Sequence, residues 1–260
     1  SDNHWLMTTT TAGAGKVMAH LEFCHQVLWP ELDIAFTSVT EQWAQYSIAG
    51  PHSRDVLKKL VDPQHDMSNE AFPYMACGAI TICNGIPARL FRISFSGEMA
   101  YEIGVPNRYG DALIRAIMDA GKEFGITPYG LEALSTMRIE KGHVAGGELN
   151  GQTTPRDLGL IKMVSQKKDC IGKHMSERPA MLAPDRPIFV GLKPKNPKSK
   201  LTGGAHFLDH GAKPSLENDL GHIMSVAYSP MLKSWIGLGI VKRGRERIGE
   251  TIRAVDFVRG

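Results

Sequence analysis

The chain has 260 residues, of which 42% are hydrophobic and 22% are charged, so it can bury a substantial core in one or two domains. Its net charge is only +3, and lysines scattered among acids do not form the basic stripe that nucleic-acid binding needs. No apolar run approaches the ~20 residues of a membrane-spanning helix, and no leader peptide is visible. We therefore expect a cytoplasmic protein that binds neither nucleic acid nor membrane.

The first part of the chain mixes strand and helix patterns. Strands are predicted over residues 4–10, 33–40 and 43–49, and helices over residues 12–28 and from Pro51 onward. Asn84-Gly85, between two apolar runs, predicts a hairpin whose two-residue turn has positive φ at both positions. Strand-like alternation then covers residues 89–105 with a break at Ser96-Gly97, and Asn107 is expected to cap a helix that ends near residue 124.

The character of the sequence changes after about residue 183. Prolines and glycines there separate short β-type runs at residues 188–192, 205–208, 221–227, 235–241 and 251–258. Short strands at such spacing predict a small barrel or sandwich. We therefore predict an α+β fold with a mixed domain over residues 1–183 and a small C-terminal β-barrel over residues 184–260.

The sequence shows no signature of a metal site, a phosphate-binding loop or a dinucleotide site. The four cysteines, at positions 24, 77, 83 and 170, have neither Cys-x-x-Cys spacing nor grouped histidines, so we expect no metal site and a reducing compartment. Gly13-Ala14-Gly15-Lys16 imitates the end of a phosphate-binding loop, but Val17 stands where a metal-binding hydroxyl is needed. No strand is followed by Gly-x-Gly-x-x-Gly, so no dinucleotide site is expected either.

Two segments carry most of the chemical information. The segment 95–102, Phe-Ser-Gly-Glu-Met-Ala-Tyr-Glu, places Glu98 and Glu102 around a strand that leaves a glycine turn, with Tyr101 and Glu102 on opposite faces. The segment 128–142 places Arg138 in an amphipathic stretch that ends at a glycine. By composition alone, such a glutamate is usually solvated and such an arginine usually lies on the surface. Together, the two segments predict a pocket.

Both segments resemble motifs of the folate-binding aminomethyltransferases, the family of the glycine cleavage T-protein. Further similar segments occur in family order at residues 49–51, 154–160, 169–173 and 221–230. Residues 7–11 and 35–44 are similar to one branch of the family, the C-terminal region of the alpha subunits of heterotetrameric sarcosine oxidases. The resemblance spans nearly the whole chain, and it implies a folate site in the first domain with the barrel closing over it.

The resemblance also implies roles for individual residues. Glu102 matches the glutamate that holds the pterin ring, whose N–H donors suit an ionised carboxylate. Arg138 matches an arginine with a planar donor fork for a carboxylate or ring oxygen, and Phe95 matches a stacking tyrosine. Thr9, Thr10 and Thr11 align near further folate contacts. The family's catalytic aspartate belongs to a segment that this sequence does not contain, so no catalytic residue is assigned and the N-terminal part of the domain is expected to be missing.

The function implied by the resemblance is transfer of a one-carbon unit to tetrahydrofolate. A flavin-carrying partner subunit would oxidise sarcosine, and this chain would trap the product as methylene-tetrahydrofolate, in a complex that also contains smaller subunits. The isolated chain is then not expected to be catalytically competent. Three alternatives remain open: a T-protein-like aminomethyltransferase, a non-catalytic subunit-assembly module of the same fold, and an iron–sulfur assembly relative that would use Cys170.

Overall fold

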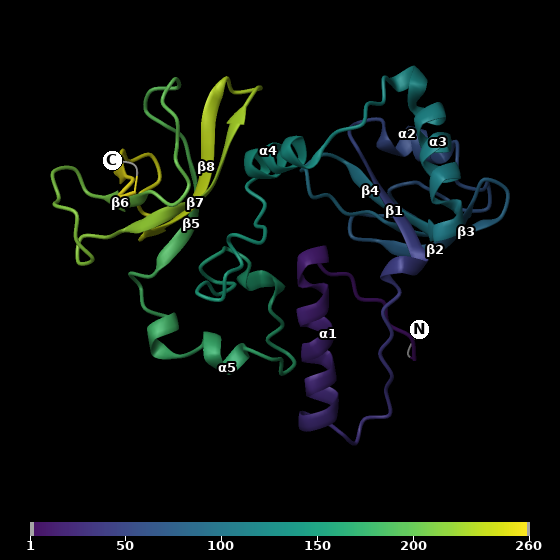
Figure 1. The fold of residues 1–260 in the computed structure, drawn as a ribbon, viewed down its shortest axis with the longest axis horizontal. Helices are drawn as coiled ribbons and strands as arrows, with labels where there is room; N and C mark the ends of the chain where they lie inside the picture. Colours follow the sequence, from purple (N-terminus) through teal and green to yellow (C-terminus); the bar gives the residue numbers. More distant parts are fainter. Residues whose placement is uncertain (1–2, 259–260) are drawn as a thin grey trace.

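The computed structural model describes residues 3–258, so the outermost residues of both predicted domains, 1–2 and 259–260, lie outside the described residues. The chain forms two lobes, each built on one antiparallel sheet (Figure 1). The first sheet contains β1 (Trp43–Ala49), β2 (Cys77–Ile82), β3 (Ile86–Phe91) and β4 (Ala100–Pro106). The second contains β5 (Pro187–Leu192), β6 (His206–Leu208), β7 (Gly221–Ser229), β8 (Ser234–Lys242) and β9 (Arg253–Val255). The predicted mixture of helix and sheet is confirmed.

The first sheet has the strand order β1-β4-β3-β2, which places β4 between β1 and β3. Tyr101, Ile103 and Val105 on β4 are completely buried, because they point toward the helices α2 (Ser53–Lys58) and α3 (Gly110–Gly121). The alternating residues of β4 point to the opposite face of the sheet. One face of this sheet is therefore the core, and the other carries charged and polar side chains together with the aromatic residues Trp43 and Phe91.

The β2–β3 hairpin confirms the predicted positive φ angles, which are 65° at Asn84 and 101° at Gly85. The turn is one residue longer than predicted, because Ile82 pairs with Ile86 and Cys83 also has a positive φ of 48°. Asp62 explains this shape, since its buried carboxylate accepts the backbone N–H groups of Asn84 and Gly85, each at 2.9 Å. The extra residue lets the turn reach this acceptor.

Two of the predicted strands are wrong. Residues 4–10 and 33–40 run without a strand partner, and large apolar side chains in them, including Trp5, Met7 and Ile34, are exposed. Strand propensity reflects packing on a sheet, and neither segment has a sheet to join among the described residues. The predicted helix between them is confirmed as α1 (Ala14–Phe23) with a π-helical turn over Cys24–Leu28.

Helix α3 also departs from the prediction at its start. The chain first makes a 3-10 turn over Asn107–Tyr109, and a second such turn, Lys122–Phe124, follows the helix. The side chain of Asn107 donates to the carbonyl of Glu41 instead of capping the helix. The predicted cap is therefore replaced by a contact between β4 and the chain that leads into β1.

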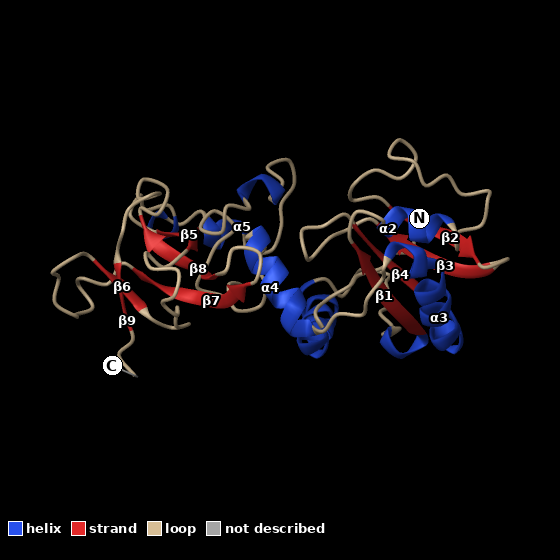
Figure 2. Cartoon of the chain, turned by 90° about the horizontal axis from the view of Figure 1, so that it is seen from above, coloured by secondary structure: helices blue, strands red, loops and turns tan. Residues whose placement is uncertain are grey.

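The second sheet has the order β5-β8-β7-β6-β9, so all five predicted β-type runs form strands, although the last shortens to three residues. Ahead of it, α4 (Leu131–Lys141) packs against β7 and β8, with Ile139 in a cluster that contains Ile236 and Leu238. Figure 2 shows α4 lying between the two sheets. The domain boundary near residue 183 stays a prediction.

The remaining helical pieces are short. They are α5 (Lys173–Ser176) and the 3-10 turns Thr11–Gly13, Thr40–Gln42, Ile161–Met163 and Pro179–Met181. Within residues 3–258, every helix is too short or too polar to cross a membrane.

Gly221, at the start of β7, provides a test of the second sheet. Its φ is +128°, and an added Cβ would collide with the carbonyl oxygen of Ile240. We expect Gly221→Ala to lower the free energy of unfolding by roughly 2–4 kcal/mol, because it combines backbone strain with overpacking against a neighbouring strand. Gly203→Ala is the control, since a Cβ there meets nothing within 4 Å. Urea unfolding followed by circular dichroism compares the two, and equal midpoints would contradict the β7–β8 register.

Candidate functional site

Glu102 lies on the face of the first sheet that α2 and α3 do not cover. Its neighbour Tyr101 is buried on the other face, where the hydroxyl accepts a hydrogen bond from Arg54 Nε at 2.8 Å, so the predicted division of the two side chains is confirmed. Glu102 Oε2 accepts a hydrogen bond from Gln45 Nε2 on β1. Within residues 3–258, the other carboxylate oxygen has no hydrogen-bond partner. A partly exposed carboxylate is thus held in place by one neutral donor.

Four residues that the sequence did not single out share this face with Glu102. Arg89 on β3 lies opposite Gly104 on β4, and its guanidinium packs over the Trp43 ring at 3.8 Å from the centroid. We name this group, Trp43, Gln45, Arg89, Glu102 and Gly104, the open-face cluster. Alternation along each strand was visible in the sequence, but the register that brings the five residues together was not.

The two motif segments meet at the turn before β4. Gly97 has a φ of 92°, and the side chain of Lys141 at the end of α4 packs against its backbone. The Phe95 ring, 38% exposed, makes an edge contact with the ring of His143, with centroids 4.9 Å apart. The sequence-predicted Phe95 is therefore brought to the end of the helix that carries Arg138.

Arg138 is 7% exposed and is bound on several sides by protein. Its Nη1 donates to Glu148 Oε2 at 3.0 Å and to the carbonyl of His143 at 3.2 Å, and its Nη2 donates to Ser225 Oγ at 2.8 Å. Glu148 is completely buried and also accepts bonds from Ser225 Oγ and from the backbone N–H of Ala145. The arginine thus joins α4 and the loop that follows it to β7. A contact between Arg138 and folate stays a prediction.

The three predicted threonines lie apart from the contacts described so far. Thr9, Thr10 and Thr11 are exposed and lead into α1 through a 3-10 turn. The hydroxyl of Thr9 donates to the carbonyl of Thr10 at 3.0 Å, and that carbonyl also accepts the N–H of Gly13 at 2.9 Å. None of these bonds reaches the open-face cluster, so the role of the threonines in binding folate stays a prediction.

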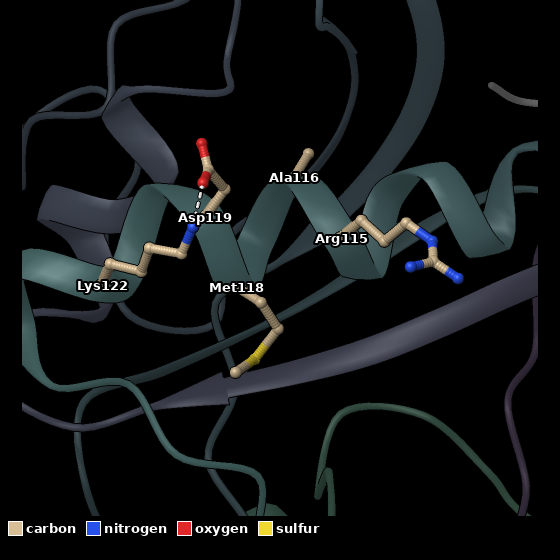
Figure 3. A pocket seen from close by; sticks show the side chains of 5 residues that line it. All are labelled: Arg115, Ala116, Met118, Asp119 and Lys122. Carbon is tan, nitrogen blue, oxygen red and sulfur yellow. Dashed lines mark hydrogen bonds and ion pairs between the residues drawn. The ribbon is translucent and has the colours of Figure 1, made fainter.

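The remaining candidate features lie away from the open-face cluster. All four cysteines are free, and the described part of the chain has no group of three or more histidine, cysteine or acidic side chains that could hold a metal ion. A shallow hollow on α3 (Figure 3) is lined by Arg115, Ala116, Met118, Asp119 and Lys122. Helix α3 covers the sheet face opposite Glu102, so this hollow is separate from the open-face cluster.

The buried Arg138–Glu148 pair generates a stability prediction. Arg138→Met leaves the Glu148 carboxylate buried without its counter-charge, so we expect a loss of about 3–5 kcal/mol in the free energy of unfolding. The double variant Arg138→Met, Glu148→Met removes both charges and should recover part of that loss. Arg115→Met, which breaks the exposed pair with Asp111, should leave the unfolding midpoint nearly unchanged. A double variant no more stable than the single one would contradict the assignment.

His143 generates a pH prediction. Burial, and then the positive charges of Arg138 and Lys141, lower the pKa of His143, against the opposing effect of Glu148. The unfolded chain takes up this proton near pH 6.5 while the folded chain does not, so stability falls as the pH drops through that value. His143→Phe keeps a ring against Phe95 and should show a shallower loss of stability between about pH 7 and pH 5. Thermal unfolding measured across this range tests it, and identical slopes would contradict it.

Comparison with known proteins identifies the family. Residues 1–168 match the family model of the GCVT N-terminal domain, and residues 188–256 match that of the glycine cleavage T-protein C-terminal barrel domain. The chain is 51% identical over 253 residues to the sarcosine oxidase subunit alpha of Rhizobium meliloti, covering 96% of this chain and 25% of that protein. It is 31% identical over 262 residues to an aminomethyltransferase of Caldanaerobacter subterraneus, covering 98% of this chain and 64% of that protein.

A solved structure shows the same fold. The glycine cleavage system aminomethyltransferase T from Bartonella henselae aligns with a TM-score of 0.72 at 20% identity, over 94% of this chain and 62% of that one. The chain thus spans a quarter of the sarcosine oxidase subunit and under two thirds of the aminomethyltransferase. With the first matched domain covering more than half of its residues, the chain belongs to the glycine cleavage T-protein family and pairs a GCVT domain with a T-protein C-terminal barrel domain.

Proposed function

We propose that the open face of the first sheet binds a reduced folate, and that Glu102 holds the pterin ring. The observation that carries this proposal is the state of the Glu102 carboxylate: one oxygen accepts a hydrogen bond from Gln45, and the other has no hydrogen-bond partner within residues 3–258. A pterin edge presents neighbouring N–H donors, which an ionised carboxylate accepts with charge assistance.

We further propose that the chain is the folate-binding region of a sarcosine oxidase alpha subunit. The supporting finding is the 51% identity to such a subunit over 96% of this chain. A flavin-carrying partner subunit would then oxidise sarcosine, and the one-carbon unit would be kept here as methylene-tetrahydrofolate. Bound tetrahydrofolate would supply the nucleophilic nitrogen. The chain's own part would be to orient the ring and to keep water from the one-carbon unit, which water would otherwise release as formaldehyde.

Glu102→Gln tests the folate site. The change keeps the size of the side chain but replaces an accepting oxygen with a donor that faces the pterin's own donors. Losing a hydrogen bond to a charged group costs roughly 1.5–3 kcal/mol, so the affinity for folinic acid should fall about ten- to a hundredfold. Calorimetric titration of the 260-residue chain measures this, with circular dichroism to confirm folding.

Glu98→Gln is the matched control, because Glu98 is an exposed glutamate of the same segment that lies before β4. Its affinity for folinic acid should change much less. If the wild type and the Glu102 variant bind equally, the glutamate has no part in folate binding. A wild-type chain that does not bind at all would favour the assembly-module alternative.

A further inference from the structure

The open-face cluster contains two opposite charges that do not pair with each other. Arg89 lies opposite Gly104, and Glu102 lies two positions before Gly104 on the adjacent strand. Such diagonal neighbours are roughly 7–8 Å apart, within reach of two long side chains. Yet Glu102 bonds to Gln45, Arg89 packs on Trp43, and the guanidinium forms no ion pair within residues 3–258. Each charge is held by a neutral side chain of β1 instead of by the other.

At Gly104, which lies opposite Arg89, β4 carries no side chain, and Gln45 and Trp43 of β1 lie over this position. Gly104 has no Cβ, and an added one would touch Gln45 Oε1 and the Trp43 ring, both at 3.7 Å. An ion pair between a solvent-exposed arginine and glutamate would contribute little free energy. An arginine stacked on tryptophan, in contrast, is held in a defined orientation. The result is one acceptor and one donor fork on the same open face, with Phe91 opposite Glu102 and Gly104 opposite Arg89.

We propose that Arg89 is a second folate-contacting residue, which donates to the carbonyl oxygen of the pterin ring while Glu102 accepts from the N–H donors beside it. This inference rests on the proposed function. The pterin edge carries an oxygen acceptor next to a ring N–H and an amino group, so its order of acceptor and donors is complementary to Arg89 and Glu102. The planar guanidinium suits such an oxygen better than an ammonium group would. The pair together would select the ring and fix which edge enters the site.

The test is titration of the 260-residue chain with two probes, folinic acid and 6-methyltetrahydropterin, which has the ring but not the glutamate tail. Arg89→Gln should weaken both probes by about ten- to a hundredfold. Arg89→Lys keeps the charge but loses the fork and the stacking, so its loss should be smaller but measurable. Arg115→Gln, which removes the same charge from exposed α3, should bind both probes as the wild type does.

The outcomes separate this inference from the proposed function. Unchanged affinity in Arg89→Gln, with the loss in Glu102→Gln retained, would overturn the inference and leave the folate site standing. If Arg89→Gln lowers the affinity for folinic acid but not for 6-methyltetrahydropterin, Arg89 contacts the carboxylates of the glutamate tail. That result would also overturn the proposed contact between Arg89 and the pterin ring. If the wild type binds neither probe, both proposals fail. Thermal unfolding checks that each variant is folded. If Arg89→Gln does not fold, Arg89→Lys replaces it in the test, and an Arg89→Lys variant that binds both probes as tightly as the wild type would overturn the inference.

Discussion

The alternation of side chains along β4 is the constraint on which both the core and the candidate site depend. Because successive residues of a strand point to opposite faces, burial of Tyr101, Ile103 and Val105 obliges Glu102 and Gly104 to face the other way. A slip of one residue in the register would exchange these two sets. The same apolar packing that stabilises the first lobe therefore also positions the carboxylate that we propose binds folate.

Buried ion pairs organise the region where regular structure is sparse. Arg138 and Glu148 join α4 and its following loop to β7, and Arg186 pairs with Asp157 just before β5 at 2.6 Å. Burial acts to raise the pKa of Asp157, but hydrogen bonds from Arg186 and Thr154 outweigh it and hold that pKa below its ordinary value. Buried pairs are weak sources of net stability but are costly to break singly. They suit a segment that must hold one conformation without a sheet or a long helix.

This arrangement changes how the two motif segments relate to function. The glutamate of the first segment is partly exposed on a sheet face, whereas the arginine of the second is enclosed by Glu148 and Ser225. Phe95 and His143 make the contact between the segments. A motif residue can thus hold a helix to a sheet instead of facing a ligand, whereas Arg89, which belongs to neither motif, lies on the same open face as Glu102.

The sequence by itself determined the fold class, the hairpin at Asn84-Gly85, the strands of both sheets and the opposite orientation of Tyr101 and Glu102, because these depend on local periodicity and turn chemistry. It misplaced strands at residues 4–10 and 33–40, since strand propensity needs a partner that local sequence does not reveal. Only the tertiary structure decided that Arg138 meets Ser225 of β7 and that Arg89 shares the open face with Glu102. The first joins residues far apart in the chain and the second places residues of different strands on one face, so both depend on helix packing and strand register, which no single segment encodes.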